Sequence, residues 1–128
     1  MPRSTVNFDT VRKIGLTLAG VEESTAYGVP ALKVRGKLLA CIPAHRSAEP
    51  ASVVVRVDFN DRAELLAADP DVYYVTDHYA GYTAVLVRLS RIKPYLLRDL
   101  LGMAYKFVTR KSAPYSPIRK RSPSERIR

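Results

Sequence analysis

The sequence predicts an α+β fold: a mostly antiparallel sheet of about five strands, with an N-terminal and a C-terminal helix packed on one face. Two observations lead to this prediction. Apolar residues recur at helical spacing near both ends of the chain, and the middle contains short apolar runs separated by turn residues. The chain has 128 residues, 47% of them hydrophobic, which is enough for one domain with a core and no disulfide.

Three segments have helical character. Apolar spacing over residues 8–19, with Asn7 as a cap and Gly20 after the end, predicts the first helix. Asp61 and Glu64 resemble a capping box before a short helix over residues 63–68. A longer helix is expected over residues 94–108, with one apolar stripe: Leu97, Leu100, Leu101, Ala104 and Val108.

The clearest β-hairpin signal lies at residues 31–42. Runs over 31–34 and 38–42 flank Arg35-Gly36-Lys37, which predicts a three-residue loop with Val34 opposite Leu38 and Leu32 opposite Ala40. Further strands are expected over residues 52–57, 72–75 and 82–89. Residues 21–30 mix acids, small residues, glycine and proline, so they are expected to form a connecting loop.

Positive charge is concentrated at the C-terminus. The chain carries a net charge of +9, and residues 110–128 contain seven basic side chains against one acidic, a net +6. Serine and proline dominate there, so we expect a domain over residues 1–108 and a disordered basic tail over 109–128. A basic chain favours polyanionic partners such as DNA.

Composition also limits the location and the chemistry. One cysteine and no apolar leader segment indicate a cytoplasmic protein, and no apolar run is long enough to span a bilayer. Cys41, His78 and Asp77 could supply a thiol, a base and an orienting group, but no flanking signature supports a catalytic triad. His45 and His78 show no metal-ligand spacing with the cysteine. We therefore expect a non-enzymatic protein without a cofactor or metal, and the oligomeric state stays open.

Three groups of residues are candidates for nucleic-acid contact. Cations at a hairpin tip can reach phosphates, aromatic side chains in a glycine-containing loop can stack on a base, and basic residues in a tail can follow the DNA backbone. The tip residues are Lys33, Arg35 and Lys37; the loop residues are His78, Tyr79 and Tyr82; the tail residues are Arg110, Lys111, Arg119, Lys120 and Arg121. Each group also has a plainer explanation: solvated charge at the tip and in the tail, and tyrosines covering the core edge in the loop.

Several stretches in order resemble one protein family. The segment from Glu22 to Lys37, EESTAYGVPALKVRGK, resembles the leading motif of the MmcQ/YjbR family of small bacterial proteins. AADP at 67–70, VTDHYAGY at 75–82 and VLVRL at 85–89 agree with it, so the resemblance spans residues 8–108. It implies an α+β fold described as a double-wing DNA-binding domain, in which hairpins act as wings against the duplex. The family domain normally ends soon after its last helix, whereas a basic tail continues here.

These observations lead to two hypotheses. The first is a DNA-binding protein whose hairpin wings, at residues 33–37 and 78–82, and basic tail contact the phosphate backbone. The alternative is a protein-interaction or small-ligand module in which Tyr27 and the 79–82 aromatics line a surface pocket. A continuous basic face favours DNA, whereas interruption of that face by Glu22, Glu23 and Asp77 favours another partner.

Overall fold

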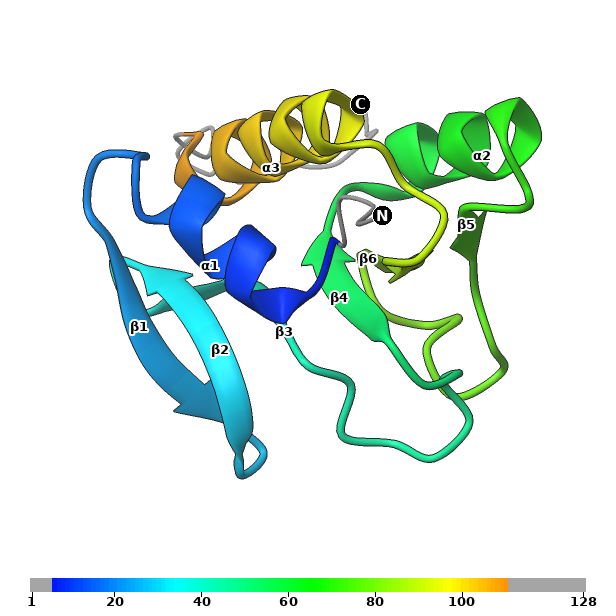
Figure 1. Ribbon diagram of the computed structural model, residues 1–128, viewed down its shortest axis with the longest axis horizontal. Coiled ribbons are helices and arrows are strands. Elements are labelled where there is room, and N and C mark those ends of the chain that lie inside the picture. The colour runs from blue at the N-terminus through cyan, green and yellow to red at the C-terminus, as the bar shows by residue number, and fades with distance from the viewer. Residues whose placement is uncertain (1–5, 111–128) are drawn as a thin grey trace, which may run out of the picture.

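The computed structural model describes residues 6–110, which form three helices and six strands (Figure 1). The predicted tail beyond Arg110 lies outside the described residues. Within 6–110, no helix is long and apolar enough to cross a membrane. The elements in chain order are α1 (Phe8–Gly15), β1 (Val21–Ala26), β2 (Val29–Val34), β3 (Lys37–Cys41), β4 (Ser52–Arg56), α2 (Phe59–Ala68), β5 (Tyr73–Tyr74), β6 (Ala84–Arg88) and α3 (Pro94–Thr109).

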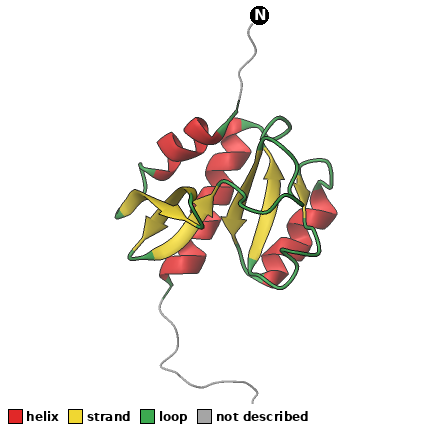
Figure 2. Ribbon diagram, turned by 90° about the horizontal axis from the view of Figure 1, so that it is seen from below, coloured by secondary structure: helices red, strands yellow, loops and turns green. Residues whose placement is uncertain are grey.

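The strands form one antiparallel sheet in the order β1-β2-β3-β4-β6-β5. At the centre of the sheet, β3 and β4 pair only at Ala40 with Val55 and at Cys41 with Val54. The sheet therefore consists of two halves, β1-β2-β3 and β4-β6-β5, which diverge from a short junction, as Figure 2 shows. The predicted α+β fold with an antiparallel sheet is confirmed.

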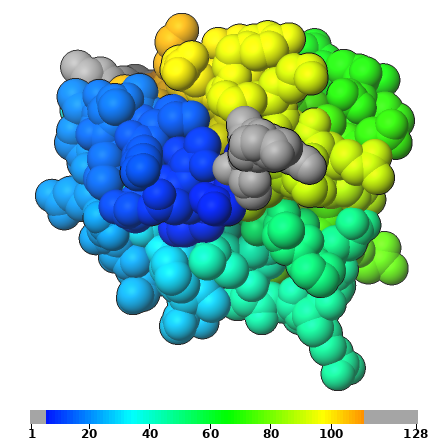
Figure 3. All heavy atoms as spheres, in the orientation of Figure 1, coloured from blue at the N-terminus to red at the C-terminus, as the bar shows by residue number. Residues whose placement is uncertain are grey.

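The helices cover one face of this sheet. Leu97 and Leu101 of α3 are fully buried against strand residues such as Leu39 and Val55, and α1 contacts α3. All five residues of the apolar stripe predicted for α3 are buried. Figure 3 shows α1 in blue and α3 in yellow side by side on this side of the molecule. Burying a leucine side chain stabilises a fold by roughly 1.5–3 kcal/mol, so this stripe holds α3 on the sheet.

The prediction of a loop over residues 21–30 is wrong, because residues 21–26 form β1. Only Val21 of this strand is buried, since β1 is an edge strand in which residues 22–25 are exposed. Such a strand has no apolar alternation to reveal it. Tyr27 and Gly28 connect β1 to β2 as a two-residue turn with positive φ angles of 56° and 79°.

The predicted hairpin exists, but its loop is shorter than expected. Arg35 and Gly36 alone form the turn, with φ angles of 54° and 76°, so Val34 pairs with Lys37 and not with Leu38. A register shift after Leu32 then restores the predicted pairing of Leu32 with Ala40. Two-residue turns with positive φ match strand twist better than the three-residue loop that we expected.

Helix ends also differ from the predictions. The first helix ends at Gly15 and not at residue 19. A Cβ added at Gly15 would lie 2.5 Å from a side-chain atom of Leu32. The second begins at Phe59, because Asp58 and not Asp61 is its cap and accepts a hydrogen bond from the Asp61 amide at 2.8 Å. The last two predicted strands are shorter than expected, at 73–74 and 84–88.

Candidate functional site

The sheet face opposite the helices carries a second apolar cluster. Strand alternation directs one side chain from each of four strands to this face along the row that crosses the junction. These residues are Ala31, Cys41, Val54 and Leu86, and all four are buried. Tyr79 and Ala84 complete the cluster.

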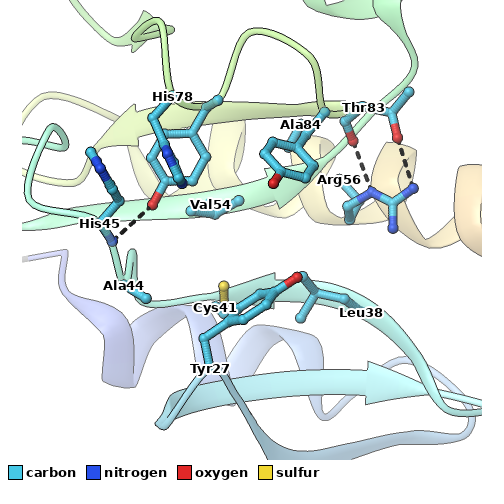
Figure 4. A pocket seen from close by; sticks show the side chains of 12 residues that line it. Tyr27, Leu38, Cys41, Ala44, His45, Val54, Arg56, His78, Thr83 and Ala84 are labelled. Atoms are coloured by element: carbon cyan, nitrogen blue, oxygen red, sulfur yellow. Dashed lines mark hydrogen bonds between the residues drawn. The ribbon is translucent and has the colours of Figure 1, made fainter.

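A pocket of about 540 Å³ opens on this cluster. Both halves of the sheet and the loops around 44–45 and 78–83 contribute to it (Figure 4). Its lining residues are Tyr27, Leu38, Cys41, Ala44, His45, Val54, Arg56, His78, Tyr79, Tyr82, Thr83 and Ala84. Apolar and aromatic side chains dominate, and no aspartate or glutamate of residues 6–110 lines the pocket.

Two histidines and a tyrosine form one wall. The rings of His45 and His78 stack with centroids 3.6 Å apart and 6° between their planes, and Tyr79 meets the His78 ring edge-on at 4.8 Å. The His45 amide donates a hydrogen bond of 3.2 Å to the Tyr79 hydroxyl. Desolvation lowers the pKa of His45, and the nearby charges of His78 and Arg46 lower it further. The stack is therefore built for neutral His45.

Arg56 lies at the other end of the pocket, where β3 and β4 separate. Its Nε donates to the Thr83 carbonyl and its guanidinium to the Thr83 hydroxyl, both at 2.8 Å. Its guanidinium carbon also lies 5.4 Å from the centroid of the Phe107 ring on α3. Within residues 6–110 no carboxylate forms an ion pair with Arg56. Arg56 therefore places a guanidinium at the edge of the pocket, between Thr83 and Phe107, with no described carboxylate within ion-pair distance.

Tyr27 and Cys41 differ sharply in exposure. The Tyr27 side chain is 81% exposed and extends from the β1–β2 turn beside Cys41 and Leu38 (Figure 4). The Cys41 thiol is free and buried, and burial raises its pKa to about 11.

Among residues 6–110, no group of three or more histidine, cysteine, aspartate or glutamate side chains is arranged to hold a metal.

The structure separates the predicted site residues. His78, Tyr79 and Tyr82 line the pocket, whereas Lys33, Arg35 and Lys37 do not. Lys33 faces the open side of the sheet directly opposite Glu22, and Arg35 and Lys37 are exposed at the β2–β3 turn. Tyr79 is 9% exposed and Tyr82 54% exposed.

Of the predicted tail residues, Arg110 can be described. It lies 3.8 Å from the Asp58 carboxylate and also packs over the Phe107 ring. Lys111, Arg119, Lys120 and Arg121 lie outside the described residues.

Acidic side chains partly interrupt the positive charge on the sheet face opposite the helices. Glu22 lies on it by strand alternation, because its neighbour Val21 points into the helix-side core. Asp77 is exposed beside His78. Glu23 lies on the helix side, where it pairs with Arg12 at 3.4 Å.

Sequence reasoning assigned no binding role to His45 or Arg56. Contacts between segments far apart in the sequence position both residues. The His45 amide donates to the Tyr79 hydroxyl, and the Arg56 side chain donates to the Thr83 carbonyl. The usable signal for Arg56 was a cation at the end of a valine-rich strand. His45 gave no local signal.

Comparisons with known proteins agree with this architecture. The YjbR family model matches residues 16–107. Relatives from Mycobacterium bovis and Mycobacterium tuberculosis, described as uncharacterized proteins, are 39% identical over 62 residues, covering 46% of this chain and 48% of each relative. The chain thus matches about half the length of these relatives. The crystal structure of a Deinococcus radiodurans protein with a DUF419 domain superposes with a TM-score of 0.68 at 22% identity, covering 87% of this chain and 84% of that one.

Proposed function

The chain belongs to the YjbR family, and we propose that it is a non-catalytic binding protein that holds a small molecule in the pocket on the helix-free face of its sheet. The observation that carries this proposal is the pocket itself. It measures about 540 Å³ and combines apolar and aromatic walls with a few polar groups, which are the size and composition typical of ligand sites.

Hydrogen bonds within the protein hold the loops that border the pocket. Besides the bond from His45 to Tyr79, the Ser47 and Thr76 hydroxyls share a hydrogen bond of 2.8 Å. The Glu49 amide donates to the Tyr74 hydroxyl, also at 2.8 Å. A preformed site orders fewer side chains when it binds, and this favours affinity.

A role in binding without catalysis is supported by the chemistry of the pocket. A nucleophilic cysteine needs an accessible thiolate, whereas burial of Cys41 raises its pKa to about 11.

The test is a fragment screen by two-dimensional NMR on the full chain. We expect planar aromatic fragments to shift the resonances of residues such as Tyr27, Ala84 and His78. Ala44→Trp places a large ring at the pocket opening and should abolish these shifts. Ala63→Trp, at an exposed position on α2, is the matched control and should leave them unchanged. The absence of any fragment that shifts pocket resonances contradicts the proposal.

DNA binding is a second candidate, favoured by the net charge of +9 and the exposed cations at the β2–β3 turn. Fluorescence anisotropy across a salt series tests it on a duplex with two variants of equal charge change. One replaces Lys33, Arg35 and Lys37 with glutamine, and the other replaces Arg119, Lys120 and Arg121. If the hairpin contacts phosphates, the first variant should reduce the salt slope by up to about 3.

Two other outcomes count against a wing role. If only the tail variant weakens binding, the folded domain does not contact the duplex. If wild-type protein fails to bind at low salt, DNA binding is wrong altogether.

A further inference from the structure

Resting on the ligand-binding function proposed above, we infer that the pocket selects a free small molecule with a flat aromatic ring and an attached anionic group. The ring would contact Tyr27 on one side of the pocket and Tyr82 on the other. The anion would be held by Arg56. Three features of the described residues support this inference.

The first feature is the choice of residue at position 27. Tyr27 takes the first position of a two-residue turn with both φ angles positive, where asparagine, aspartate or glycine is favoured. A bulky side chain with positive φ is strained, and such strain concentrates at ligand sites. The ring is 81% exposed, so core packing does not compensate for the strain. Contact with a ligand supplies a reason for a tyrosine at this turn.

The second feature is the placement of exposed aromatic surface on both sides. Tyr27 comes from the β1–β2 turn, and Tyr82 comes from the loop before β6 in the other half of the sheet. Tyr82 is 54% exposed, with its ring centroid 6.1 Å from that of His78. Aromatic pairs are favourable beyond the area that they bury, so a flat ring is the shape that these faces suit.

The third feature is the charge of the lining. In the part of the chain that the structure describes, its basic side chains are Arg56, His45 and His78, and neither an aspartate nor a glutamate accompanies them. Thr83 occupies only part of the guanidinium's donor capacity, which comprises five N–H groups. Charge-assisted hydrogen bonds to a carboxylate or phosphate are about twice as strong as neutral ones. An anion is therefore the complementary group at this end of the pocket.

Calorimetric titration with three probes separates the two parts of the inference. Naphthoate carries the ring and the anion, its neutral amide carries the ring alone, and cyclohexane carboxylate carries the anion alone. We expect naphthoate to bind about tenfold more tightly than either of the others.

Two variants assign the contacts to residues. Tyr27→Asn should weaken naphthoate binding by roughly three- to tenfold, whereas Tyr95→Asn, at an exposed tyrosine on α3, should not change it. Arg56→Gln should bring naphthoate down to the affinity of its amide and leave amide binding unchanged. Retained amide binding also shows that the Arg56 variant keeps its pocket.

Several outcomes would overturn the inference. If naphthoate and its amide bind with equal affinity, the anionic group is not part of what the pocket recognises. If cyclohexane carboxylate binds as tightly as naphthoate, the aromatic ring is not part of it. A single-stranded oligonucleotide that displaces naphthoate and loses affinity in Tyr27→Asn would replace the free small molecule with a nucleic-acid strand. Failure of all three probes, while other fragments shift pocket resonances, rejects this ligand class and leaves the proposed binding function intact.

Discussion

The imidazole rings of His45 and His78 stack in parallel, 3.6 Å apart, and join two loops that are 33 positions apart in the chain. The hydrogen bonds from His45 to Tyr79 and between Ser47 and Thr76 reinforce the same junction. Desolvation lowers the pKa of His45 in this stack, so uptake of a proton by His45 is expected to weaken this wall of the pocket.

Acidification should destabilise the protein through His45. Its pKa is lowered in the folded state, chiefly by desolvation, so the unfolded chain binds this proton more readily. The free energy of unfolding should therefore decrease as pH falls from about 7 to about 5, and His45→Gln should reduce that decrease. Urea denaturation at both pH values measures it.

The two carboxylates with lowered pKa values, Asp9 and Glu49, stabilise the fold throughout that range of pH. Hydrogen bonds from Arg12 lower the pKa of Asp9, and hydrogen bonds from Arg88 lower that of Glu49. Their contributions to stability are lost only below about pH 4.5. Equal pH dependence in wild type and His45→Gln would show that the stack does not couple to stability.

Local patterns predicted the core better than the pocket. The α3 stripe was identified because its burial follows helical periodicity, and β4 was identified because a run of valines is typical of a buried strand. β1 was missed because an edge strand with one buried residue carries no such pattern. The pocket combines Tyr27, Arg56 and Tyr82 from separate segments, and no local spacing shows that the fold brings them together.

Two helical glycines should respond oppositely to alanine. At Gly15, a Cβ would lie 2.5 Å from the Leu32 Cδ1 atom, and the fully buried Leu32 side chain would have to shift within the packed core, so Gly15→Ala should destabilise the protein by about 1–3 kcal/mol. A Cβ added at Gly102 would have no described atom of another element within 4 Å, so Gly102→Ala should stabilise α3 by up to about 1 kcal/mol. Chemical denaturation of both variants measures these changes in the free energy of unfolding. Equal effects would mean that α1 does not approach β2 closely.

Arg88 should hold the loops before β4 and before β5 in place. Its guanidinium pairs with Glu49 at 2.7 Å, donates to the Pro70 and Asp71 carbonyls at 3.0 and 3.1 Å, and lies over Tyr74 at 4.2 Å. Arg88→Ala should lower the free energy of unfolding by about 1–2 kcal/mol, because the two carbonyls lose their donor.

The effect should exceed that of removing the ion pair alone. Glu49→Gln keeps the carbonyl contacts, so it should be milder than Arg88→Ala, since exposed ion pairs contribute little. Arg98→Ala, at an exposed position on α3, serves as the control. A Glu49→Gln effect as large as that of Arg88→Ala would assign the stabilisation to the ion pair.

Cys41 should react slowly with thiol reagents in the native protein. Its side chain is buried, and its pKa of about 11 leaves very little thiolate at pH 8. Alkylation by iodoacetamide should be on the order of a hundredfold slower than for free cysteine, and it should accelerate as pH rises towards 11 or when the chain is unfolded. An exposed thiol introduced by Ser90→Cys in a Cys41→Ala background supplies the reference rate. Native Cys41 reacting as fast as this reference would mean that the pocket holds an accessible thiolate, and a nucleophilic role would then replace binding alone.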